Sequence, residues 1–144
     1  MRRKLTLALV LLGAAAAILS SLLVRESRQI NTRSVDSLQT IHSAQAAYAQ
    51  IHPDRGFAPS LTELGPSSGE AMIDDVLASG RKSGYIFILS TAPPDSRGRI
   101  VHYTVVASPE KHDKGTRSLF IDESGIERFT TENRAATITD PPLK

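Results

Sequence analysis

The residues best suited to chemistry in this 144-residue chain are its four histidines, at positions 42, 52, 102 and 112. They fall in four separate segments, and no two have the HxxH or HExxH spacing that brings two imidazoles to one metal ion. His102 stands in an alternating apolar and polar run, so we expect it on the solvent side of a strand. The histidine positions therefore predict no metal site.

Carboxylates and hydroxyls are the next candidates. Asp74 and Asp75 are adjacent, and adjacent residues of a helix point about 100° apart, so they cannot act together as an acid and a base. A charge at a helix N-terminus is the simpler interpretation. No serine lies in a Gly-x-Ser-x-Gly elbow. We therefore predict that the chain is not an enzyme and has no catalytic residues and no cofactor.

The segment Glu110–Gly115 could mimic a calcium-binding loop. Only Glu110 and Asp113 offer carboxylates there, and Lys111 and Lys114 oppose a cation. Calcium requires six to eight oxygen ligands, which this segment alone does not supply. We expect a solvated loop at this position.

The net positive charge of the chain comes from its first residues. The sequence has 17 Lys and Arg against 15 Asp and Glu, and Arg2, Arg3 and Lys4 precede a long apolar run. The remainder lacks the concentrated positive charge that binding to a phosphate backbone requires, so nucleic acid is not expected as a partner. The chain has no cysteine, which excludes disulfides and thiolate catalysis.

The apolar run Leu5–Val24 predicts a membrane anchor. It contains twenty residues without a charge or a proline, and as a helix it spans about 30 Å, the thickness of the hydrocarbon layer. The alternative is a cleaved signal peptide, because Ala14 and Ala16 fit an A-x-A site and cleavage would remove residues 1–17. We favour an uncleaved anchor with its N-terminus inside, and residues 1–24 form the predicted anchor region.

The next segment, from Arg25 to about Gln50, has no proline or glycine and predicts an amphipathic helix. Nothing interrupts the chain between Val24 and Arg25, so the anchor and this helix are expected to form one rod. His52-Pro53 should end it. Apolar residues recur every three or four positions on one face: Val35, Leu38, Ile41, Ala44, Tyr48 and Ile51.

After a connecting region, the apolar period changes from that of a helix to that of strands. The connecting region is expected to hold a capping box at Ser60–Glu63 and a short helix over Glu70–Ala78. The fold class is α+β, with a long N-terminal helix packed on a three- to four-stranded antiparallel sheet. Residues 25–129 form this domain, and the polar segment 130–144 is expected to be a flexible tail. The predicted strands are Tyr85–Leu89, Ile100–Ala107, Arg117–Ile121 and Ile126–Phe129.

This order of elements resembles type IV pilins and the pseudopilins of type II secretion, in particular relatives of the major pseudopilin. The resemblance implies a pilin-like fold and a structural or accessory subunit in the bacterial inner membrane, with a single transmembrane helix and the C-terminal domain in the periplasm. It also implies membrane lipid, other pilin subunits and secretion platform proteins as partners. The matching blocks are Ser37–Tyr48, Gly56–Leu61, Ile73–Ala78, Lys82–Tyr85 and Gly115–Gly125.

Two features of that family are missing from the sequence. Its processing signal is a Gly followed by Phe-Thr-Leu-Ile-Glu, which does not occur here, and no carboxylate lies between Leu5 and Val24. In the family this buried Glu pairs with the amino terminus of a neighbouring subunit. We therefore expect an anchored accessory subunit without prepilin-peptidase cleavage. The alternative is a membrane-tethered periplasmic module that binds a ligand or partner and does not polymerise.

Overall fold

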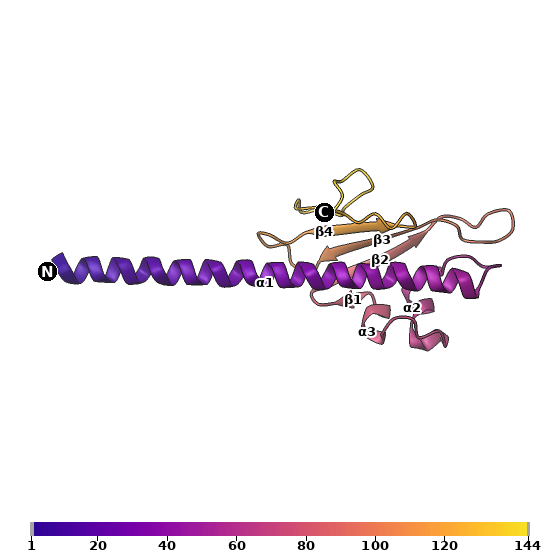
Figure 1. Cartoon of the computed structure of the whole chain (residues 1–144), viewed down its shortest axis with the longest axis horizontal. Helices are drawn as coiled ribbons and strands as arrows, with labels where there is room; N and C mark the ends of the chain where they lie inside the picture. The colour runs from indigo at the N-terminus through magenta and orange to yellow at the C-terminus, as the bar shows by residue number, and fades with distance from the viewer. Residues whose placement is uncertain (1, 144) are drawn as a thin grey trace.

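The computed structural model has one long helix lying across a five-stranded sheet, with half of the helix projecting beyond it (Figure 1). The structure describes the backbone of residues 2–143 and the side chains of residues 13–26 and 28–143. Helix α1 (Arg2–Ile51) contains 50 residues and is about 75 Å long. The predicted single rod and its end before Pro53 are confirmed.

The second half of α1 supplies one side of the core. The predicted stripe is confirmed at Leu38, Ile41, Ala44 and Tyr48, which are all buried, whereas Ile51 at the end of the helix is 61% exposed. The strand residues Tyr103, Val105 and Ala107 face this stripe in the same hydrophobic cluster. This cluster holds the helix on the sheet, since burial of an apolar side chain contributes about 1.5–3 kcal/mol.

The connection between α1 and the sheet contains short helices only: α2 (Leu61–Leu64), the 3₁₀ helix η1 (Pro66–Ser68) and α3 (Asp75–Ala78). Ser60 caps α2 by accepting a hydrogen bond from the Glu63 N–H, as predicted. The predicted helix over Glu70–Ala78 was too long. Its first half cannot be helical, because the N–H groups of Met72 and Ile73 both donate to the Leu64 carbonyl and Asp74 is the N-cap of α3.

The sheet has five antiparallel strands in the order β1-β2-β3-β4-β5, which corrects the prediction of three or four. The additional strand, β1, has two residues, too few to show a period-two pattern. The strands are β1 (Arg81–Lys82), β2 (Tyr85–Thr91), β3 (Tyr103–Pro109), β4 (Ser118–Asp122) and β5 (Arg128–Thr130).

The predicted strand Ile100–Ala107 begins three residues later than expected. Ile100 is used elsewhere: its N–H donates to the Arg55 carbonyl at 2.9 Å, and its carbonyl accepts from the Phe57 N–H at 2.9 Å. This pairing with the turn after α1 takes Ile100 away from the ladder between β2 and β3. His102 lies just outside β3 with an exposed side chain.

The segment after β5 folds back along the edge of the sheet, where the sequence predicts a flexible tail. The Phe129 N–H donates to the Pro141 carbonyl, and the Leu143 N–H donates to the Glu127 carbonyl. Asp140 is buried and accepts two hydrogen bonds from the guanidinium of Arg134, at 2.6 and 2.8 Å. These contacts give the last residues a defined place beside β5.

Candidate functional site

The structure keeps the four histidines apart. Three of them each contact one side chain of another segment: His42 with Tyr103, His52 with Glu70 and His102 with Glu123. Within the described part of the chain, no three His, Asp or Glu side chains come together as metal ligands would. The Tyr103 hydroxyl oxygen lies 2.6 Å from His42 Nδ1, and burial raises the pKa of this hydroxyl. Each pair joins two parts of the fold.

The two aspartates of the connecting region have local structural contacts. Asp74 Oδ1 accepts from the Leu77 N–H at 2.7 Å, and Oδ2 contacts the Lys82 ammonium. The hydrogen bond from Lys82 holds the pKa of Asp74 below its usual range. Asp75 occupies the first turn of α3. Asp74 therefore caps a helix and ties it to β1.

The loop Glu110–Gly115 also has its carboxylates occupied. Glu110 Oε1 lies 2.9 Å from Arg81 Nη1, and Asp113 Oδ2 lies 3.9 Å from Lys111 Nζ. A calcium site requires several oxygen atoms that converge on the ion. Both carboxylates of this loop instead lie near a basic side chain.

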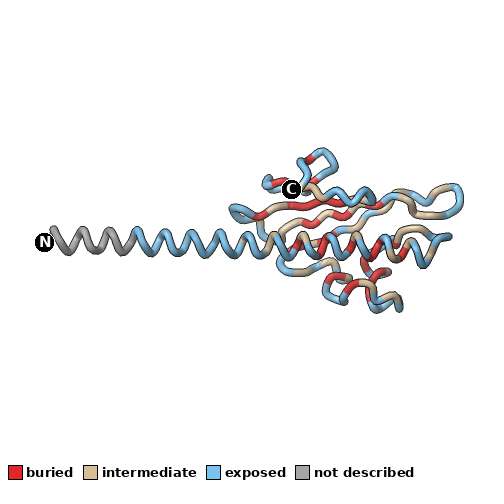
Figure 2. The backbone as a smooth tube through the Cα atoms, viewed as in Figure 1, coloured by how far each residue is buried: buried red, intermediate tan, exposed pale blue. Residues whose placement is uncertain are grey.

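The most unusual surface is the projecting half of α1. From Gly13 to Glu26 every residue is exposed, as Figure 2 shows along the helix beyond the sheet. An exposed apolar surface of this extent marks a site that contacts a membrane or another protein. Its large apolar side chains are between 51% and 62% exposed: Ile18, Leu19, Leu22, Leu23 and Val24.

The two serine hydroxyls of this segment are satisfied within the helix itself. The Ser20 hydroxyl donates to the Ala17 carbonyl at 2.9 Å, and the Ser21 hydroxyl donates to the Ile18 carbonyl at 2.8 Å. A helix that satisfies its backbone and hydroxyl groups internally can enter an apolar environment without leaving a donor unpaired. The local geometry of the segment is thus compatible with hydrocarbon.

The predicted anchor Leu5–Val24 is described only in part. The side chains of Leu5–Leu12 and of the basic flank Arg2, Arg3 and Lys4 lie outside the described residues. Over the residues that the structure does describe, no helical segment has both the length and the apolar character needed to cross a membrane.

The projecting half meets the domain at a fixed point. Ile30 is the first residue of α1 that packs on the core. Next to it, Asn31 Nδ2 donates to the Gly115 carbonyl at 2.8 Å and its Oδ1 accepts from the Tyr85 hydroxyl at 3.0 Å. The same hydroxyl lies 2.8 Å from the Arg117 carbonyl. From Asn31 back to Val24 the helix rises by about 10 Å.

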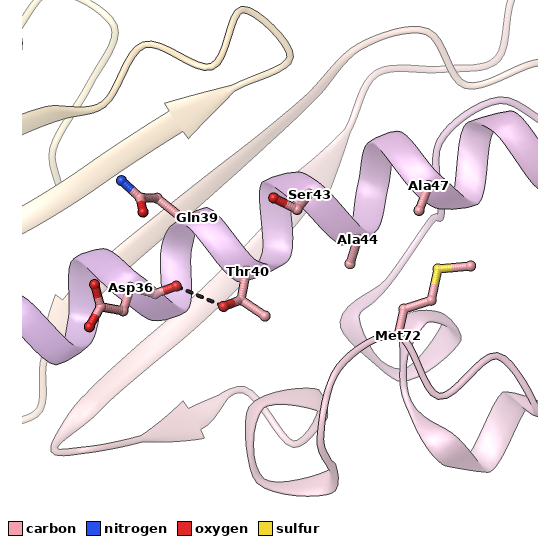
Figure 3. Close-up of a pocket in the computed structure, with 7 residues that line it drawn as sticks. All are labelled: Asp36, Gln39, Thr40, Ser43, Ala44, Ala47 and Met72. Atoms are coloured by element: carbon pink, nitrogen blue, oxygen red, sulfur yellow. Dashed lines mark hydrogen bonds between the residues drawn. The ribbon is translucent and has the colours of Figure 1, made fainter.

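A second feature is an open groove between the packed half of α1 and Met72 (Figure 3). Its volume is about 600 Å³, and Met72 from the connecting region forms one wall. Sequence reasoning missed it because Met72 becomes a neighbour of α1 only through the fold of that region. The groove is lined by Asp36, Gln39, Thr40, Ser43, Ala44, Ala47 and Met72.

Comparison with known proteins gives no relative. The chain matches no protein-family model, no curated protein and no solved structure. Function must therefore be argued from the geometry of the chain itself.

Proposed function

We propose that this chain is a membrane-anchored, pilin-like structural or accessory subunit of a type IV pilus or type II secretion system. Leu5–Val24 would hold it in the bacterial inner membrane, and residues 25–129 would form the periplasmic domain. Its partners would be membrane lipid, other pilin or pseudopilin subunits, and platform proteins of the secretion system. In this proposal the chain is not an enzyme.

The observation that carries the proposal is the division of α1 into two halves with opposite surroundings. The second half is packed on an antiparallel sheet through Leu38, Ile41 and Tyr48, whereas the described part of the first half is exposed and apolar. A water-soluble domain does not usually extend an apolar helix into solvent. A bilayer or a bundle of like helices would cover it.

The apolar content supports a bilayer as the first environment. Leu5–Val24 contains eight Leu, two Val and one Ile, each of which favours insertion by about 0.3–0.6 kcal/mol. Their sum is about 3–7 kcal/mol in favour of insertion, and the few polar residues offset only a part of it. Six basic residues, three on each side, flank the run: Arg2, Arg3, Lys4, Arg25, Arg28 and Arg33.

A membrane-tethered module that does not polymerise is the second candidate. Two observations favour it. The anchor run lacks the carboxylate that pairs neighbouring pilin subunits within the membrane, and a charge pair of that kind offsets a burial cost that each group alone would carry. The open groove between α1 and Met72 is a surface on which a soluble partner could dock.

Anchoring is tested by alkaline carbonate extraction of membranes from cells that make the full chain. We expect the protein in the membrane pellet. Leu12→Arg, near the middle of the run, should lower the favourable free energy of insertion by about 2.5–3.5 kcal/mol and release a large fraction. Leu12→Ile is the matched control and should stay in the pellet. Complete release of the unaltered chain would disprove the anchor.

Subunit and tethered module are distinguished by cysteine cross-linking, since the natural chain has no cysteine. A single cysteine in place of Leu19 should give disulfide dimers in membranes if copies pack through their projecting helices. A cysteine in place of Ile88, 56% exposed on the sheet, is the control. Dimers through neither position, together with absence from sheared filaments, would favour the tethered module.

A further inference from the structure

A second groove lies where α1 leaves the domain. It has a volume of about 400 Å³ and is formed between one face of the helix, strand β4 and the chain end. Two arginines, Arg28 and Arg117, are among the residues that line it. The complete lining is Arg28, Asn31, Thr32, Val35, Arg117, Leu119 and Leu143.

Among the described residues, no carboxylate lies within ion-pair distance of Arg28 or Arg117. The guanidinium of Arg117 stacks on the ring of Phe129, with Cζ 4.6 Å from the ring centroid, so it is held in place without being neutralised. Arg28 and Arg117 together form a positive site to which the described residues supply no counter-ion.

Arg28, at the end of the groove nearest the anchor, stands at the height of the headgroup layer of a bilayer. Arg28 stands four residues beyond Val24, which is about 6 Å along the helix axis. The polar layer on each side of the hydrocarbon core is about 5–7 Å thick. The loop between β3 and β4 lies about 4.5 Å farther from Val24 than Arg28 does, because Gly115 accepts from Asn31, three residues beyond Arg28. This loop lies at the end of the sheet from which α1 projects (Figure 1).

This end of the domain also carries an excess of positive charge. The segments 25–33 and 110–117 together contain six basic and three acidic residues. One of the three acidic residues, Glu110, is already paired with Arg81. The surroundings therefore attract an anion toward the groove. The basic residues are Arg25, Arg28, Arg33, Lys111, Lys114 and Arg117.

We propose that this groove binds the phosphate group of an anionic phospholipid of the membrane that holds the anchor. Arg28 and Arg117 would donate to the phosphate oxygens, for which the planar guanidinium is well suited. Val35 and Leu143, which are both half-buried, would lie beside the glycerol portion of the lipid. This inference rests on the proposed membrane anchoring and adds the class of lipid and the residues that bind it.

The test uses the full chain purified in a neutral detergent and titrated with short-chain phosphatidylglycerol, with binding followed by native mass spectrometry. We expect saturable binding that Arg28→Gln weakens by about fivefold, the effect of removing one cation near a membrane surface. Arg97→Gln is the matched control, because Arg97 is exposed in the loop between β2 and β3, and it should bind as the unaltered protein does. Arg28→Lys should keep part of the affinity.

Two further titrations identify the source of the phosphate. Phosphatidylcholine should bind at least fivefold more weakly, and inorganic phosphate at millimolar concentration should not displace the lipid. Displacement by inorganic phosphate, or equal weakening by Arg28→Gln and Arg97→Gln, would overturn the proposal. Carbonate extraction of Arg28→Gln separates this result from the anchor: retention in the pellet with weakened lipid binding supports the groove. Release of the unaltered chain would contradict the anchoring itself.

Discussion

Replacement of Gln45 by methionine should destabilise the domain, although the two side chains have a similar shape. Gln45 is fully buried on the face of α1 that packs against the connecting region. Its Nε2 donates to the Ala58 carbonyl at 3.0 Å, and its Oε1 accepts from the Ala58 N–H at 2.7 Å. The amide thus satisfies both backbone groups of a buried residue thirteen positions away.

The magnitude follows from these two groups. Methionine has a similar length but can neither donate nor accept in this way, so the N–H and the carbonyl of Ala58 lose their partners. A buried polar group without a partner costs about 1–3 kcal/mol, which gives about 2–6 kcal/mol for two. The additional apolar surface of methionine offsets about 1 kcal/mol. We expect the free energy of unfolding to fall by about 1–5 kcal/mol.

The assay is urea denaturation of the full chain in a neutral detergent. Tyrosine fluorescence is a suitable signal because Tyr48, Tyr85 and Tyr103 are all buried. Gln39→Met on the exposed side of α1 is the matched control and should change stability by less than about 0.5 kcal/mol. A loss for Gln45→Met no larger than that of the control would refute the reasoning, since the Ala58 backbone would then have found other partners.

Three more substitutions test the packing, the turn after α1 and the chain end. Leu38→Ala should cost about 2–5 kcal/mol in the same denaturation assay, because Leu38 is fully buried in the core. Gly56→Ala should destabilise more than Gly98→Ala: both glycines have positive φ, but only at Gly56 would a Cβ meet a backbone carbonyl oxygen, at 2.1 Å. Equal effects would show that the turn can relax. The hydrogen bonds from Arg134 lower the pKa of Asp140, so its contribution is present at neutral pH and is lost as the pH falls below the usual aspartate range. In thermal melts, Asp140→Asn should therefore flatten the decline in melting temperature at acidic pH, and an unchanged decline would contradict the assignment.

The long helix was predictable because its signal is local and repeated. Apolar residues at every third or fourth position identify the buried face without knowledge of its partner, and this face proved to contain Leu38, Ile41 and Tyr48. The same pattern held a clue that sequence reasoning missed. Gln45 is four residues after Ile41 and three before Tyr48, so it lies on the apolar face. A polar residue there predicts a buried hydrogen-bond partner, although the sequence does not identify it as Ala58.

The predicted helix and strand bounds were wrong where the local residue pattern favours one conformation and a hydrogen bond to a distant segment favours another. Glu70–Ile73 has helical residue types, yet Met72 and Ile73 donate to Leu64 and remain outside the helix. Ile100 has strand character but pairs with the turn after α1 instead of continuing β3. In both places a hydrogen bond to another segment decided the conformation, and such bonds leave no periodic trace in the sequence.

The candidate site, too, could be predicted from the sequence only in part. The apolar run and its basic flanks could be identified from the sequence, because composition alone defines them. The position of Arg28 and Arg117 in one groove could not be predicted from the sequence. The two residues are separated by 88 others, and their proximity depends on how β4 lies against α1. A basic residue near an anchor is common, whereas a groove lined by two arginines from distant segments requires the tertiary fold.

The continuity of α1 links the anchor to the domain in a way that a flexible linker would not. No glycine or proline lies between Val24 and Asn31, and Asn31 is fixed to both Gly115 and Tyr85. In the proposed bilayer placement, the depth of the anchor therefore sets the height and the rotation of the domain. Each residue of helix corresponds to about 1.5 Å of height and 100° of rotation. The groove at Arg28 would then face the headgroups because of the helix geometry itself, and loss of helical structure between Val24 and Asn31 would remove that alignment while leaving both the anchor and the domain intact.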